Sequence, residues 1–228
     1  MSVVAGIVNV SGFLAVQRLT TNVTGHFAFF VDEVFRLNFR QGFVYFLYIF
    51  SFFLGSFVSG MLTEFAARKN ERLIYAAPVV IEGIILLFVG LLYPYFINSN
   101  PDAIAFSLLF AMGLQNSLVT TISNSAVRTT HLTGLFTDLG IELSQLFFYR
   151  SLQHKKELRS SIKLRFTIIS FFFLGGISGG LLYSIMNLHL LVVASILLVV
   201  GLVYDNIKFR VILLKCRLRT LEPDDINS

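Results

Sequence analysis

Charged residues are scarce in this sequence. They make up 14% of its 228 residues, whereas a soluble domain of this length carries roughly 25%. The single cysteine, Cys216, excludes a disulfide framework. Hydrophobic residues reach 55%, and the mean hydropathy is +0.76. The chain therefore reads as a polytopic membrane protein, and its net charge of +5 indicates membrane orientation rather than nucleic-acid binding.

Motifs of catalysis and metal binding are also lacking. The four histidines are scattered, without the spacing of metal ligands. The sequence contains no P-loop, no Gly-x-Ser-x-Gly and no Cys-x-x-Cys. We therefore expect no enzyme of a familiar type, no cofactor and no metal site.

Long apolar runs are abundant instead. About 20 consecutive apolar residues are enough to cross a bilayer. Such runs lie at 42–62, 73–93, 102–122, 165–187 and 190–207, and a shorter one lies at 1–16. Together they predict six membrane spans.

Three segments of the chain occur twice, in the same order. TTNVTGH (20–26) matches TTHLTGL (129–135), FFLGSFVSG (52–60) matches FFLGGISGG (172–180), and ILLFVGLLY (85–93) matches ILLVVGLVY (196–204). Each half therefore reads as a span, a Thr-Gly element and two further spans. The predicted units are a first repeat (1–93), a connector (94–102), a second repeat (103–207) and a tail (208–228). The first span is shorter than its counterpart, so either the chain begins upstream or the Thr-Gly element completes the span.

The positions of lysine and arginine indicate how the spans are oriented. All of these residues except Arg18, Arg36 and Arg40 fall on one side of the six predicted spans. By the positive-inside rule this side is cytoplasmic. Both termini are thus expected in the cytoplasm, and the connector 94–102 outside it.

An odd number of spans per repeat inverts the second repeat relative to the first. The predicted fold is an all-α polytopic membrane protein with six transmembrane helices, arranged as two inverted three-helix repeats, each with a broken helix at its Thr-Gly element. Inverted repeats are common in secondary transporters, whose substrate site lies near the membrane midplane between the repeats.

The Thr-Gly elements are predicted to be helix breaks. Broken helices persist in a membrane only where they are buried or line a wet cavity. The segment 134–148 is expected to form a half-helix about 22 Å long, with Asp138, Glu142 and Gln145 on one face. Its N-terminal amides favour an anionic ligand. The alternative is that the threonine hydroxyls only satisfy the broken backbone.

Three polar residues lie inside predicted spans. Asn9 and Asn116 precede the two Thr-Gly elements and either join helices or line a polar pocket. Glu82 is central in its span, where an ionised carboxyl is costly. It is a candidate for proton coupling, with a hydrogen bond to a neighbouring helix as the alternative.

Small residues recur at four-residue spacing in the second span of each half. The pairs are Gly175 with Gly179, Gly176 with Gly180, Gly55 with Ser59 and Ser56 with Gly60. This pattern predicts close helix packing, and we expect the spans at 42–62 and 165–187 to cross each other.

The stretch 113–140 resembles the signature of the YoaK family, bacterial membrane proteins of unknown function. The matching residues are Gly113, Gln115, Asn116, Arg128, Thr129, Thr130, Thr133, Gly134, Thr137 and Asp138. In the first half, Asn22, Thr24 and Gly25 match an Asn-x-Thr-Gly-Asn element, and His26 departs from it. The resemblance implies a six-span protein of the bacterial inner membrane, without an established substrate.

Two classes of function fit these patterns. The first is a secondary transporter or permease for a small solute, with an anionic solute as an option, and the second is a non-transporting membrane protein with an assembly or regulatory role. An intramembrane enzyme ranks third. The expected partners are the lipid bilayer, a small-molecule solute and, as an option, further copies of the chain; nucleic acid is not expected. The candidate solute-contacting residues are Asn9, Thr21, Asn22, Thr24, Gly25, Asn116, Arg128, Thr130, Thr133, Gly134 and Asp138.

Overall fold

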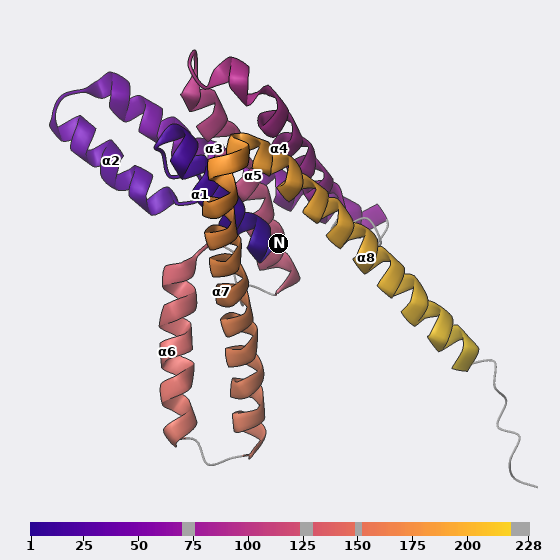
Figure 1. Cartoon of the computed structure of the whole chain (residues 1–228). Coiled ribbons are helices and arrows are strands. Elements are labelled where there is room, and N and C mark those ends of the chain that lie inside the picture. The colour runs from indigo at the N-terminus through magenta and orange to yellow at the C-terminus, as the bar shows by residue number, and fades with distance from the viewer. Residues whose placement is uncertain (70–75, 124–129, 149–151, 220–228) are drawn as a thin grey trace, which may run out of the picture.

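The computed structural model describes residues 1–69, 76–123, 130–148 and 152–219, and every regular element in these ranges is a helix. In chain order they are α1 (Ser2–Val16), α2 (Val23–Phe35), α3 (Phe39–Lys69), α4 (Ala76–Phe96), α5 (Pro101–Ile122), α6 (Leu132–Phe148), α7 (Leu152–Met186), the 3₁₀ turn η2 (Asn187–His189) and α8 (Leu190–Arg219). Figure 1 shows their arrangement.

Four helical stretches of the described chain are long and apolar enough to cross a membrane. They are Phe39–Arg68, Ala76–Phe96, Pro101–Ile122 and Gln153–Asp205. The last stretch covers most of α7 and the first half of α8, which meet at η2 and diverge from there (Figure 1). α1 is apolar but has only 15 residues. These helices indicate a membrane protein.

Helix boundaries follow from local sequence chemistry. α1 ends at Gln17, whose backbone is left-handed (φ 52°). Leu37 (φ 60°) makes the turn between α2 and α3, and Asn187 (φ 49°) the turn between α7 and α8. Pro101 begins α5, where its missing amide proton removes no helical hydrogen bond. α8 continues to Arg219, so the helix extends into the segment predicted as a tail.

α5 is the most buried of the long apolar helices, with Leu108, Met112 and Leu114 shielded from solvent. α3 packs along α5, and α1 packs along α7. Both crossings are close because glycine allows backbone to meet backbone. In the first, Gly113 faces the carbonyl of Phe52; in the second, Gly6 faces the carbonyl of Phe172.

The other glycines of the two crossings are placed in the same way. Gly55 faces the carbonyl of Phe110, and Gly175 faces the carbonyl of Val3. Gly176, Gly179 and Gly180 lie against side chains and backbone of α1. A side chain at Gly60 would meet open space, so Gly60 does not take part in the close approach.

The expectation that the spans 42–62 and 165–187 cross each other is wrong. Within the described residues the α3 and α7 backbones do not come close to each other, since each packs instead on a different helix. The small-residue pattern identifies a face that approaches another backbone, but it does not identify the partner. The partners here are α5 and α1, which supply glycines of their own.

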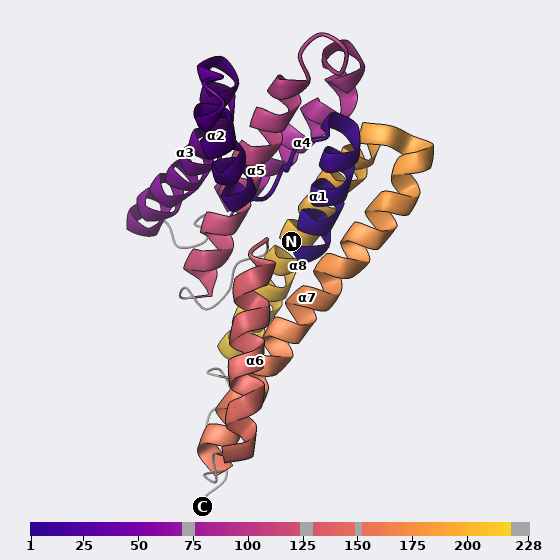
Figure 2. The same ribbon diagram turned by 90° about the vertical axis from the view of Figure 1, so that its left-hand side faces the viewer.

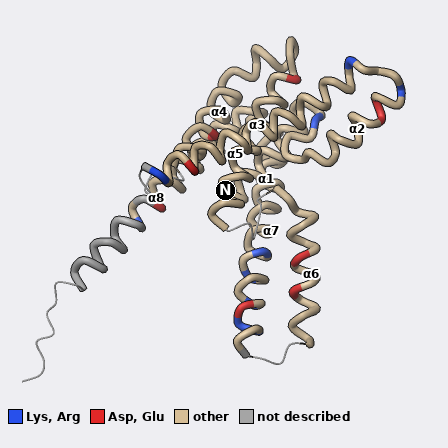
Figure 3. Tube along the Cα trace, turned by 180° about the vertical axis from the view of Figure 1, so that it is seen from behind, with Lys and Arg blue, Asp and Glu red and all other residues tan. Residues whose placement is uncertain are grey.

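Two helix pairs extend away from the central helices. α2 packs on the first part of α3, and α6 packs on the first part of α7. Figures 1 and 2 show that the two pairs project from different ends of the molecule. Figure 3 shows charged residues at the turn between α2 and α3 and along α6, α7 and α8, while the central helices are nearly free of them.

Candidate functional site

A cavity of about 1020 Å³ lies where the starts of α2 and α6 meet the central helices. It is lined by Asn9, Leu19, Thr21, Asn22, Val23, Thr24, Gly25, Ala28, Phe52, Ser56, Asn116, Ser117, Thr120, Thr130, His131, Leu132, Thr133 and Phe172. Both halves of the chain contribute to this wall, and none of the described lining residues is Lys, Arg, Asp or Glu.

An asparagine–threonine contact holds each Thr-Gly element against a central helix. Thr21 donates a hydrogen bond to the Oδ1 of Asn9 over 2.6 Å. In the other half Asn116 donates to the Oγ1 of Thr130 over 2.5 Å, and its Oδ1 accepts from the Thr130 amide over 3.2 Å. An asparagine and a threonine thus hold the segment before α2, and a second asparagine and threonine hold the segment before α6.

The two short helices begin at the cavity. The Asn22 side chain caps α2 by accepting a hydrogen bond from the amide of Gly25 over 3.1 Å. α6 begins at Leu132, two residues before the start expected from the sequence. Val23, Thr24, Leu132 and Thr133, which stand in the first turns, line the cavity. First-turn amides lack partners within a helix and carry partial positive charge.

Several polar groups in the cavity wall remain free. Within the described residues the hydroxyls of Thr24 and Thr133 make no hydrogen bond, and the same is true of the Asn9 amide nitrogen. Thr21 and Thr130, in contrast, are engaged by the two asparagines. The wall therefore combines structural polar groups with uncommitted hydrogen-bond donors.

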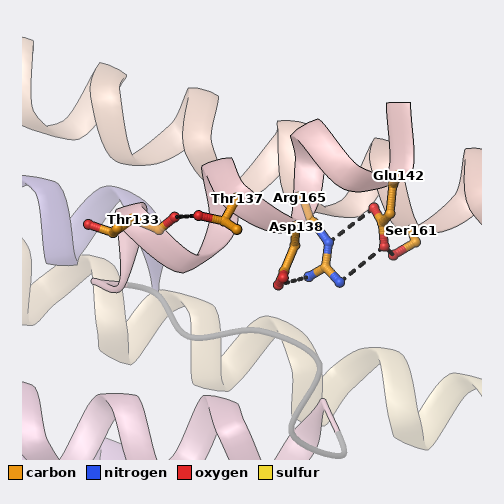
Figure 4. Close-up of polar contacts among 6 residues, drawn as sticks. All are labelled: Thr133, Thr137, Asp138, Glu142, Ser161 and Arg165. Atoms are coloured by element: carbon orange, nitrogen blue, oxygen red, sulfur yellow. Dashed lines mark hydrogen bonds and ion pairs between the residues drawn. The ribbon is translucent and has the colours of Figure 1, made fainter. Parts of the chain in front are cut away.

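Asp138 lies away from this cavity. Its carboxylate pairs with Arg165 of α7 at 3.4 Å, and Arg165 also pairs with Glu142 at 3.1 Å. Ser161 donates a hydrogen bond to Glu142 over 2.6 Å. Figure 4 shows that Thr133 lies at the start of α6, while Asp138 and Glu142 lie further along it around the Arg165 guanidinium. The polar face of α6 is thus used against α7.

Three further predicted residues have separate positions. Arg128 lies outside the described residues. Gly134 is in the first turn of α6, with its backbone against the His131 ring rather than in the cavity wall. Glu82 is fully buried in α4 and does not line the cavity.

Aromatic and hydroxyl residues of the wall were missed by sequence reasoning. Phe52 and Phe172 open the repeated FFLG segments, so their duplication was a usable signal. Ser117 and Thr120 continue the α5 face that carries Asn116. His131 takes the place of the capping Asn22, and no pattern in the sequence singles it out.

The fold and the cavity define a helical membrane protein with a cavity that residues from both halves of the chain line. The chain belongs to a family described as a protein of unknown function (DUF1275), whose model matches residues 1–204. Comparisons with curated proteins and with solved structures found no match.

Proposed function

We propose that this protein is a secondary transporter or permease for a small solute, bound in the cavity between the α2 and α6 N-termini. The observation that carries the proposal is the pair of Asn–Thr contacts, which aim both short helices at one chamber of about 1020 Å³. In this proposal the halves are inverted three-span repeats, with six spans in all and both termini in the cytoplasm. Such repeats typically enclose a midplane substrate site.

The chemistry of the wall favours an anion or a strong hydrogen-bond acceptor. The free side-chain groups can all donate: they are two threonine hydroxyls and the Asn9 amide nitrogen. The first turns of the two helices add partial positive charge. No described lining residue carries a negative charge. Helix N-termini stabilise anions without a charged side chain.

A thermal-shift screen of the purified protein tests this proposal. The probes are chloride, nitrate, sulfate, phosphate, acetate and lactate. We expect at least one to raise the melting temperature of the wild type. Thr133→Val and Thr24→Val remove free hydroxyls, and each is expected to weaken binding by about tenfold to a hundredfold, since a hydrogen bond to a charged group contributes about 1.5–3 kcal/mol.

Thr167→Val is the matched control because Thr167 is exposed on α7 and bonds only to the carbonyl of Lys163. If a probe stabilises the wild type and Thr133→Val equally, Thr133 does not belong to the binding site and the proposed site is wrong. If no probe acts, the non-transporting alternative is favoured. Uptake of the active probe into proteoliposomes then separates transport from binding alone.

A further inference from the structure

Glu82 is a buried acid that the cavity does not use. It is 0% exposed, and neither carboxyl oxygen has a hydrogen-bond partner within the described residues. An isolated carboxylate in such a place costs several kcal/mol unless a cation or a proton neutralises it. Ionisable residues at this depth of a membrane helix are functional candidates for that reason.

The two helices that pack on α4 each carry a buried polar side chain, Ser195 on α8 and Gln115 on α5. Ser195 of α8 donates to the carbonyl of Gly83 over 2.7 Å, so its hydroxyl is already used. Gln115 of α5 is also fully buried, and its amide nitrogen donates to the carbonyl of Met1 over 3.0 Å. Its Oε1 has no partner among the described residues.

α4, which carries Glu82, packs on α5 and on α8. Gln115, which binds Met1, directly precedes Asn116, which holds Thr130 at the cavity. The helix that packs beside Glu82 therefore also carries a residue of the cavity wall, Asn116.

We propose that Glu82 binds and releases one proton in each transport cycle and so couples solute in the cavity to the proton gradient. Binding of the proton turns the carboxylate into a neutral acid with one O–H donor, and release on the other side of the membrane restores the carboxylate. The Oε1 of Gln115, unpartnered among the described residues on the helix that packs against α4, is an acceptor of the kind that a neutral acid needs. This inference rests on the proposed function.

The first test is infrared spectroscopy of the purified wild type across a pH series. We expect the C=O stretch of a protonated carboxylic acid to be lost as pH rises above about 6, where ordinary carboxyls are ionised, and to be absent over this range in Glu82→Gln. Glu142→Gln is the control, because Glu142 is ion-paired with Arg165 outside the cavity and should leave the band unchanged. A wild type without this band, or a band that survives in Glu82→Gln, overturns the proton site.

The second test uses proteoliposomes that contain a pH-sensitive dye, with imposed gradients of chloride, nitrate, sulfate or phosphate. We expect the wild type to change the internal pH with at least one probe. Glu82→Gln should abolish that change while its affinity for the probe in the thermal-shift assay stays within twofold. Glu82→Asp, which keeps a carboxyl, should retain part of the proton movement.

The outcomes separate the two proposals. Equal proton movement in the wild type and Glu82→Gln, or none in the wild type with any probe, overturns the coupling. A titrating band together with no stabilisation by any probe contradicts the proposed function and leaves the proton site standing.

Glutamine has the shape of the protonated acid, so we expect Glu82→Gln to fold. If it does not fold, the Glu82→Asp variant is used instead, and a shift in the pH at which its infrared band is lost identifies residue 82 as the proton site.

Discussion

The α2–α3 pair and the α6–α7 pair occupy matched places in the repeat, yet different chemistry joins their helices. In the first pair, His26 lies against Tyr48 with ring centroids 4.8 Å apart, and Phe29 stacks on Tyr45 at 5.3 Å. His26 is anchored by a 2.5 Å contact between its Nε2 and the carbonyl of Leu19. Aromatic rings thus fill this interface.

The second pair places other residues at the same positions. Leu135 and Ile168, the counterparts of His26 and Tyr48, belong to one small apolar cluster. Asp138 and Arg165, the counterparts of Phe29 and Tyr45, form an ion pair. The helix positions are therefore repeated, but the side chains that join them are not.

Several of the residues that line the cavity, unlike those of the outer helix pairs, are repeated in both halves of the chain. There the Asn–Thr contacts, the threonine of each first turn and the phenylalanine of FFLG occur in both halves. The two halves thus share the cavity wall and the glycine crossings, and differ away from them. This pattern is expected if the cavity face carries the function and the outer pairs only hold α2 and α6 in place.

The largest effect is expected where the two halves agree most, at the glycine crossings. Gly113→Val and Gly6→Val each drive a side chain into the carbonyl of the facing helix. We expect each to cost about 3 kcal/mol or more, the upper range for overpacking, because backbone cannot move aside as a side chain can. Loss of the thermal unfolding transition in detergent measures it.

Gly60→Val is the control for these variants, because no atom lies near its added side chain. We expect a change below about 1 kcal/mol, and not a destabilising one, because valine has a somewhat higher helix propensity than glycine. If Gly60→Val destabilises the protein as much as Gly113→Val does, close packing is not what the glycines provide.

The next largest effect should separate the two outer pairs. Arg165→Met removes the cation between Asp138 and Glu142; the Arg165 side chain is 11% exposed and that of Glu142 13%. We expect a loss of about 2–3 kcal/mol, because a poorly hydrated carboxylate is left unpaired. The comparison variant, Tyr45→Leu, removes a ring stack and should cost about 1 kcal/mol beyond the lost buried area.

Changing the salt concentration distinguishes the ion-paired interface from the aromatic one. Raising the ionic strength screens charge pairs, so the difference in melting temperature between the wild type and Arg165→Met should shrink. The difference between the wild type and Tyr45→Leu should stay constant. A difference for Tyr45→Leu that shrinks as much would show that the α2–α3 pair also depends on charge.

Much of the cavity could be predicted because the sequence is duplicated. The repeated Thr-Gly elements and the asparagines before them led to Asn9, Asn116, Thr24 and Thr133, and all four line one chamber. Duplication supplies this information because residues at matched positions of two packed repeats tend to face a shared space. The helical class followed from the apolar runs alone.

Other features depend on partners that no local pattern encodes. The spacing of Asp138 and Glu142 predicted a polar face on α6, but the residue it meets, Arg165, belongs to α7. The glycines predicted close approach, but their partners lie on α5 and α1. Periodicity describes one helix at a time, whereas these contacts are set by how several helices pack.

A smaller effect is expected at the two Asn–Thr contacts, where the halves differ in strength. Asn116→Leu leaves the hydroxyl and the amide of Thr130 without this partner, at a cost of about 1–3 kcal/mol. Asn9→Leu leaves only the Thr21 hydroxyl, at a cost of about 1 kcal/mol. Thermal unfolding of both variants measures the order, and a larger loss for Asn9→Leu would contradict it.

The smallest effect is expected at the helix caps. Asn22 caps α2, whereas His131 stands at the matched place before α6 and accepts a backbone hydrogen bond from Leu135 over 3.1 Å. Asn22→Ala should cost about 0.5–2 kcal/mol, the usual loss of an asparagine cap. His131→Asn should instead stabilise α6 by up to about 1 kcal/mol, because it installs the cap that the first half already has. Thermal unfolding without added probe anions separates the two outcomes, and a destabilised His131→Asn would mean that the histidine ring itself holds the start of α6.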